Sequence, residues 1–259
     1  MHHPAPARPL PEHLLPEHLA PQLWRGHRMG THAPAGWASG HASLDAELPG
    51  GGWPLQTLTE ILQPPQSCAI WRLLSPALSC FTDRGGVVFL IGPPYQPHLP
   101  GLVQRGLAAH QVFWVRCASQ AERLWAAEQA LKAQAVSAVL CWLPQARPEH
   151  MRRLQACATR HPGLLFAMRP AAAAREASAA PLRLLARLSA HQARLEVDIL
   201  KRRGPLLTQT LDLSLPDLPG LRDRSDPSVP RHPAPAMSWA RGHVSSIDHV
   251  PALDRLVIG

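Results

Sequence analysis

The sequence predicts a three-layer α/β fold in which a mainly parallel sheet lies between helices and carries an antiparallel hairpin at one edge. Short apolar segments alternate with helical segments through the middle of the chain, which is the order of repeated strand–helix–strand units. Two later segments alternate apolar and polar residues with a period of two, as antiparallel strands with one wet face do. Prolines concentrate at both ends, where they disfavour regular structure.

The 259 residues are expected to form one core with two extensions. We assign residues 1–39 to a Pro-rich N-terminal extension, whose end (31–39) is a linker, residues 40–215 to the core and residues 216–259 to a flexible C-terminal tail. No apolar run reaches the length of a membrane-spanning helix, and the N-terminus lacks the apolar segment of a secretory signal. The chain is therefore expected to be cytoplasmic, with no contact to a membrane.

The core strands are expected to be short apolar segments separated by helices. Val87 to Ile91 is the clearest, because an unbroken apolar run is typical of a strand buried on both faces. Ser119 and Glu122 form a capping box, which predicts the start of the best helix. The expected strands are residues 58–62, 87–91, 112–115, 138–143 and 164–168, followed by a hairpin of 195–200 and 209–215.

Other segments carry weaker or conflicting signals. Ser43 is expected to cap a short helix that ends at Gly50-Gly51-Gly52, where the turn requires positive φ. Pro76 interrupts the helical pattern of residues 69–81, so we expect a kink or a later helix start. Residues 171–193 are rich in Ala and Arg and are expected to be part loop and part helix.

The composition indicates a basic protein without a metal or cofactor. Lys and Arg number 26 against 18 Asp and Glu, which is compatible with nucleic acid, with an acidic partner, or with the ordinary surface of an arginine-rich proteome. None of the five cysteines lies in a C-x-x-C pair, and the fifteen histidines form no H-E-x-x-H. Neither a disulfide framework nor a metal site is expected.

The stretch from Gly40 to Trp71 carries a resemblance to a known core. Ser43-Leu44-Asp45 is followed by Leu48, Gly51-Gly52 and Pro54, and then by Glu60-Ile61 before a loop and an apolar helix. In this order the motifs resemble the RecA-type recombinase core, over roughly residues 40–215. The resemblance implies a RecA-like fold with a phosphate-binding loop after the first strand.

That loop lacks the residues that phosphate binding requires, which are glycine N–H groups, a lysine and a Ser or Thr. Ala69 and Ile70 stand where the lysine and the threonine would be, and Pro64 and Pro65 have no N–H group to donate. Of the polar groups, Ser67 remains. The degenerate loop comprises Gln63, Pro64, Pro65, Gln66, Ser67, Cys68, Ala69 and Ile70.

The acidic residues of a RecA-type ATPase are also missing. The strand over 138–143 ends in Cys141-Trp142-Leu143 without the carboxylate that would hold Mg²⁺, and the region 92–96 lacks the carboxylate that would orient water. We therefore expect no catalytic residue and no ATP hydrolysis. The former phosphate space is expected to be packed shut by Pro64, Pro65, Cys68 and Ala69.

A closer resemblance is to the ImuA family of RecA/SulA-like accessory proteins. It rests on five stretches in the same order: Leu23–Gly26, Leu48–Pro54, Gly92–Tyr95, Leu124–Leu131 and Leu200–Gly204. The resemblance implies a non-catalytic role in damage-induced (SOS) translesion synthesis and mutagenesis. The implied partners are an inactive Y-family-polymerase-like protein, an error-prone C-family polymerase and RecA.

Basic and exposed-looking side chains are the candidates for partner or DNA contacts. Arginines around the expected helix 148–160, and others from Arg169 to Arg194 in the region where RecA-like cores place DNA-facing loops, are compatible with single-stranded DNA. Few aromatic residues lie near them in sequence, so a platform for base stacking is not evident. The candidates are Arg152, Arg153, Lys201, Arg202, Arg203, Trp24, Arg25, Leu253, Arg255 and Leu256.

Two other functions stay open at this point. The family is also similar to SulA, which implies a cell-division inhibitor that binds the tubulin-like division protein. An active recombinase-like ATPase that binds DNA is the second, and measurable affinity for ATP with Mg²⁺ would favour it.

Overall fold

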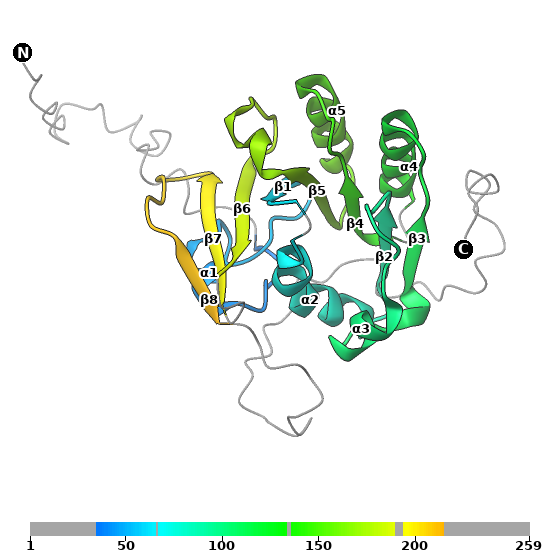
Figure 1. Cartoon of the computed structure of the whole chain (residues 1–259), viewed down its shortest axis with the longest axis horizontal. Coiled ribbons are helices and arrows are strands. Elements are labelled where there is room, and N and C mark those ends of the chain that lie inside the picture. The colour runs from blue at the N-terminus through cyan, green and yellow to red at the C-terminus, as the bar shows by residue number, and fades with distance from the viewer. Residues whose placement is uncertain (1–34, 66, 134–135, 190–193, 215–259) are drawn as a thin grey trace, which may run out of the picture.

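A computed structural model describes residues 35–65, 67–133, 136–189 and 194–214 of the chain. These residues form a sheet covered by helices on both faces (Figure 1), so the predicted α/β class with a mainly parallel sheet is confirmed. The sheet has eight strands in the order β3-β2-β4-β5-β1-β6-β7-β8. Their bounds are β1 Leu58–Gln63, β2 Val87–Ile91, β3 Val112–Val115, β4 Val136–Trp142, β5 Leu164–Pro170, β6 Leu182–Leu188, β7 Arg194–Lys201 and β8 Leu211–Ser214.

The strands from β3 to β6 in this order are parallel, and the antiparallel pairs β6–β7 and β7–β8 form one edge. The hairpin expected at the end of the core is therefore confirmed. The helices are α1 Ala42–Glu47, α2 Ala69–Thr82, α3 Leu99–Gln104, α4 Gln120–Lys132 and α5 Pro148–Ala158, with short 3-10 helices at Ala109–Gln111 and Ala171–Arg175.

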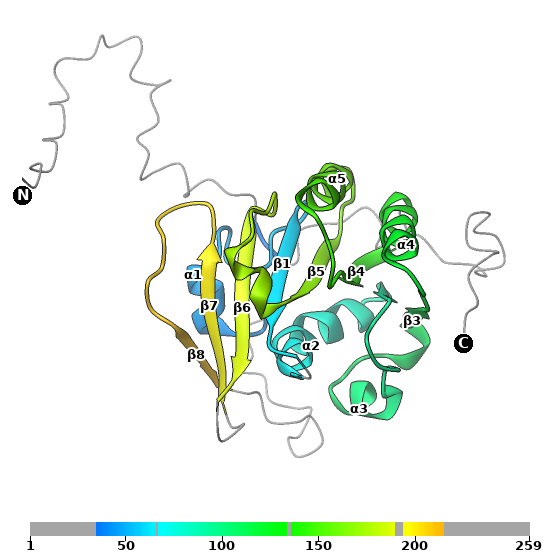
Figure 2. The same ribbon diagram turned by 45° about the horizontal axis from the view of Figure 1, so that its top comes forward.

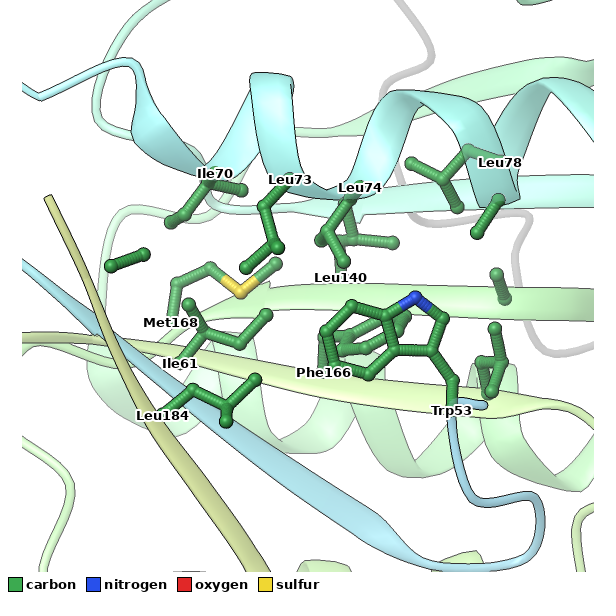
Figure 3. Packing of buried hydrophobic residues seen from close by; sticks show 14 of the residues in the cluster. Trp53, Ile61, Ile70, Leu73, Leu74, Leu78, Leu140, Phe166, Met168 and Leu184 are labelled. Carbon is green, nitrogen blue, oxygen red and sulfur yellow. The ribbon is translucent and has the colours of Figure 1, made fainter. Parts of the chain in front are cut away.

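Alternation along the strands separates the apolar side chains into two layers. Ile61 of β1 and Phe166 of β5 point to the face covered by α2, where they meet Leu73, Leu74 and other apolar residues of that helix (Figure 3). Leu58 and Leu165, on the same strands, belong to the other layer, which α4 and α5 cover (Figure 2). Strands buried on both faces are what the continuous apolar runs in the sequence predicted.

Strand β6 corrects the expectation of loop and helix for residues 171–193. It lies parallel to β1, with Ile61 opposite Leu184. Leu182, Leu184 and Ala186 are buried with the α2 layer, while Arg183 between them points to the other face and is also buried. The arginines concealed the period-two alternation, because an arginine on a strand normally indicates a solvent-exposed face.

The core begins before the predicted boundary at Gly40. Trp37 is buried, stacks on Phe81 with ring centroids 3.8 Å apart, and forms an antiparallel bridge with Trp53. A Cβ atom on Gly52 would lie 2.3 Å from the carbonyl oxygen of Trp37, so this close approach requires glycine. The expectation of a linker was therefore wrong for the last residues of 31–39.

Helix α2 runs through Pro76 and does not start after it. Proline cannot donate to the carbonyl of Arg72, and side chains bond to neighbouring carbonyls: the Ser75 hydroxyl donates to Trp71 O, and His41 Nε2 lies 3.2 Å from Leu73 O. His41, rather than the expected Ser43, precedes the first residue of α1. No helix in the described ranges is long and apolar enough to cross a membrane.

Candidate functional site

The connection from β1 to α2 lies where the resemblance places a phosphate-binding loop, and its own side chains bond to the amides at the helix start. The Ile70 amide donates to Oε1 of Gln63 at 3.4 Å, and the Ala69 amide donates to Oγ of Ser67 at 3.2 Å. Amides at a helix N-terminus are the groups that bind an anion when they are free. Here two of them already have an acceptor from the chain.

Burial in this loop differs from the expectation in part. Ala69 and Ile70 are buried in the core beneath α2, as a closed loop requires, and Pro64 is half-buried. Pro65 and Cys68 are exposed, so the prediction that they pack the former phosphate space shut was wrong. Gln66 lies outside the described residues.

An aromatic pair occupies the position next to this loop. Trp142, the last residue of β4, packs against Trp71 of the first turn of α2 with ring centroids 5.9 Å apart. The indole of Trp142 is buried and belongs to the same apolar cluster as Ile70. Apolar rings therefore stand at the strand end where a carboxylate would be needed to hold Mg²⁺.

Two guanidinium groups lie near the loop. Arg72 on α2 and Arg105 at the end of α3 are both half-buried. Burial and, secondarily, the positive charge of Arg72 lower the pKa of Arg105, while Cys68 acts in the opposite direction. This surface is positively charged but carries none of the glycine cradle of a nucleotide site.

A buried ion network lies in the layer on the other face of β1. The carboxylate of Glu60, which is 0% exposed, accepts from Nη1 of Arg169 at 3.0 Å and from Nε of Arg183 at 2.7 Å. Arg169 also donates to Glu176 at 2.6 Å and to the Ala146 carbonyl at 2.8 Å. Arg183 donates to the Ala173 carbonyl at 2.8 Å. Two carboxylates thus balance two guanidiniums.

This network removes Arg169 and Arg183 from the candidates for DNA contact, because both side chains are buried and paired with Glu60 inside the protein. It also explains the position of the segment 171–181, because the Ala173 carbonyl accepts from Arg183 and the Glu176 carboxylate accepts from Arg169. Sequence reasoning missed this role because Glu60 and its two partners are more than 100 positions apart.

The predicted surface arginines divide into bonded and unbonded groups. Arg153 donates from Nη2 to Oε2 of the buried Glu128 at 2.5 Å, and Arg202 pairs with Glu47 at 2.7 Å. Arg152 and Arg203 are exposed, and Lys201 donates to the Ser178 carbonyl. Arg152 and Arg153 lie on α5, whereas Lys201 ends β7 and Arg202 and Arg203 follow it. The two groups therefore do not form one patch (Figure 1).

The remaining predicted contact residues lie outside the described ranges: Trp24, Arg25, Leu253, Arg255 and Leu256. Their predicted role stays a prediction. Within the described ranges, no group of three or more His, Cys, Asp or Glu side chains is placed to hold a metal ion.

A groove between α4 and α5 was not predicted. Its volume is about 780 Å³. Leu124 and Trp125 of α4 line it on one side, and Arg147, which immediately precedes α5, lines it together with His150 and Arg153 of that helix. Trp125 is 42% exposed. The sequence made no platform for base stacking evident, because few aromatic residues lie near the α5 arginines along the chain, but the structure places Trp125 beside them. Trp125 is 22 or more positions away from them along the chain, and the packing of α4 against α5 brings them together.

No protein-family model matches the chain. Two curated relatives are similar to it, both called "Protein ImuA" and both from Caulobacter vibrioides, one from strain NA1000 / CB15N and one from strain ATCC 19089 / CIP 103742 / CB 15. Each is 33% identical over 138 residues, which cover 51% of this chain. The match spans 57% of the length of these relatives, a little over half.

Proposed function

From its similarity to ImuA, which confirms the family resemblance seen in the sequence, we propose that this chain is a non-catalytic accessory protein of damage-induced mutagenesis. In this proposal it acts in translesion DNA synthesis by holding other proteins together. Neither a nucleotide nor a metal takes part in its action.

The observation that carries the non-catalytic part is the loop between β1 and α2. Its amides at Ala69 and Ile70 bond to Ser67 and Gln63, and it lacks both the lysine and the hydroxyl that a phosphate loop uses. The packing of Trp142 against Trp71 supports the same conclusion, since an indole cannot act as a ligand for Mg²⁺.

The partners are proposed from the family resemblance. They are an inactive Y-family-polymerase-like protein, RecA and, directly or through the first partner, an error-prone C-family polymerase. A RecA-like core without turnover would bind a RecA subunit or the end of a RecA filament. We assign the contacts with the polymerase-like protein to the extensions 1–39 and 216–259, through Trp24, Arg25 and the apolar-basic group Leu253, Arg255 and Leu256.

Co-purification of the tagged full-length chain after DNA damage tests these partners. The proposal expects RecA and the polymerase-like protein to be recovered both with and without nuclease treatment, because the contacts are between proteins. Deleting residues 216–259 should abolish recovery of the polymerase-like protein. If the deletion leaves both partners bound, the assignment of the tail is wrong.

Two outcomes would replace the proposal. Recovery of the tubulin-like division protein, with filamentous cells that division-protein mutations rescue, would favour a SulA-like inhibitor. Micromolar affinity for ATP with Mg²⁺ by calorimetry would favour a recombinase-like ATPase instead. The proposal expects no heat of ATP binding by the full-length chain.

A further inference from the structure

We propose that the groove between α4 and α5 binds single-stranded DNA, with one unpaired base stacked on Trp125 and the adjacent phosphates on Arg147 and neighbouring arginines of α5. This site goes beyond the proposed accessory role and does not depend on it.

The ring of Trp125 is the first reason. Large aromatic side chains are normally buried or packed, and Trp125 is one of few large apolar side chains in the described ranges that remain exposed. Its side chain lines the groove together with Leu124. Stacking of a base on such a ring tolerates any sequence, because every base has a π-face.

Charge is the second reason. The stretch from Gln120 to Arg160 carries six basic side chains against three acidic ones: Arg123, Lys132, Arg147, Arg152, Arg153 and Arg160 against Glu122, Glu128 and Glu149. Arg147 is 76% exposed, and Glu149 is 3.9 Å from it at an exposed position, which is a weak pair. Arg153, which is exposed and also pairs with Glu128, lines the same groove. The guanidinium of Arg147 therefore remains available to a phosphate.

Unsatisfied polar groups are the third reason. Gln120 lines the groove, and the oxygen and the nitrogen of its side-chain amide are buried without a hydrogen-bond partner among the described residues. An amide offers a donor and an acceptor side by side, which matches the edge of a base. On α5, His150 Nδ1 accepts from the Arg147 amide at 3.1 Å, which leaves Nε2–H as a donor in the neutral ring.

An acidic segment of a protein is the other ligand with compatible charge. The exposed ring, the donor and acceptor of Gln120 and the two arginines that line the groove favour DNA, because a run of acidic residues would use the guanidiniums but presents no aromatic face to the indole. The two kinds of ligand are distinguished by how strongly the groove binds duplex DNA and polyglutamate.

Fluorescence anisotropy of labelled oligo-dT with the full-length protein tests the site. Trp125→Ala should weaken binding at least ~5-fold, from the loss of one stacked base. Arg147→Ala should reduce the slope of log K against log salt concentration by about 0.7, the value for one phosphate contact on a single strand. Duplex DNA of the same length should bind more weakly, since its bases are already stacked.

Matched controls keep the result specific. Tyr95→Ala removes another exposed aromatic ring and Arg84→Ala another exposed arginine, and both should leave oligo-dT affinity unchanged. Circular dichroism of each variant confirms that it is folded. The accessory role is measured separately, by recovery of RecA and the polymerase-like protein with Trp125→Ala.

Three results would overturn the DNA site. They are wild-type affinity in both groove variants, equal or tighter binding of duplex DNA, and the absence of oligo-dT binding together with groove-dependent binding of polyglutamate. The last result would assign the groove to an acidic protein segment. Because none of them involves RecA or the polymerase-like protein, they leave the accessory role to its own experiment.

Discussion

The β1–α2 loop and the α4–α5 groove both lie next to helix N-termini, but they satisfy their polar groups in opposite ways. In the loop, side chains of Gln63 and Ser67 accept from the helix amides, and Trp142 fills the neighbouring space. In the groove, the Gln120 amide has no described partner and Trp125 is exposed. The resemblance to a nucleotide-binding core indicates a ligand site at the loop, whereas the unsatisfied polar groups and the exposed ring indicate one at the groove.

The largest expected effect tests how much the buried ion network, in the layer that α4 and α5 cover, contributes to stability. Glu60→Gln should lower the free energy of unfolding by about 3–5 kcal/mol, because it leaves the buried guanidiniums of Arg169 and Arg183 without their shared carboxylate. Urea denaturation measures this. Glu176→Gln is the matched control, since that carboxylate is 52% exposed and its loss should have a much smaller effect. Equal unfolding midpoints for Glu60→Gln and the wild type would show that the network is dispensable.

Acid should destabilise the protein through His161, which follows α5 and is fully buried. Burial lowers the pKa of His161 to about 4 from 6.5, so the unfolded chain binds the proton first as pH falls. Stability contributed by the neutral ring is complete above pH 6.5 and decreases down to pH 4, by about 3 kcal/mol in total and by about 2 kcal/mol at pH 5.

The measurement is the difference in unfolding free energy between about pH 7 and pH 5 for the wild type and for His161→Leu, because carboxylates titrate in both proteins. The variant should lose less stability on acidification. Identical pH profiles for the wild type and His161→Leu would contradict the burial argument.

Two adjacent arginines of α5 should differ in a smaller but measurable way. Arg153→Ala should lower the free energy of unfolding by about 1–3 kcal/mol, because Glu128 is buried and loses its partner. Arg152→Ala removes an exposed side chain with no described partner, and a change within about 0.5 kcal/mol is expected. Thermal denaturation of the two variants under the same conditions distinguishes these roles, and equal losses would show that the pair with Glu128 contributes nothing.

The smallest expected effect is in the loop. Ser67→Ala should lower the free energy of unfolding by about 1 kcal/mol, since the Ala69 amide loses its acceptor at the helix start. It should not create affinity for ATP, because the lysine and the glycine cradle remain absent. Calorimetry with Mg²⁺ and ATP checks the second point, and binding by Ser67→Ala but not by the wild type would show that self-capping alone closes the site.

Much of the fold was predictable because local signals agreed with the tertiary environment. Strand β2 has the predicted bounds Val87–Ile91, and α4 begins after Ser119, whose hydroxyl accepts from the Glu122 amide at 3.1 Å. The Ala118 amide donates to Oε2 of Glu122, and this bond, together with hydrogen bonds from Ser119, lowers the pKa of that carboxyl. These features depend on residues within one turn or one strand, so the sequence contains all of their causes.

The candidate site was less predictable, for the same reason. The loss of the phosphate-loop lysine and threonine could be read directly at Ala69 and Ile70. The sequence did not show that side chains of the loop itself accept from the helix amides in place of a phosphate, because this depends on Gln63 reaching the Ile70 amide across the turn. Strand β6 was missed because Arg183 is buried only by virtue of Glu60, which is 123 positions away.

By itself, the sequence determined most of the strand–helix order, the cap at Ser119 and the absence of phosphate-binding residues from the loop, because each follows from neighbouring residues and from which side chains are present. The tertiary structure decided which arginines are buried, which are paired and which face Trp125 across the groove. These properties depend on contacts between distant segments, where one carboxylate or one helix packing against another changes the environment of a side chain completely. An arginine has the same chemistry in both settings, and only its neighbours in space determine whether it holds the core together or remains available to a ligand.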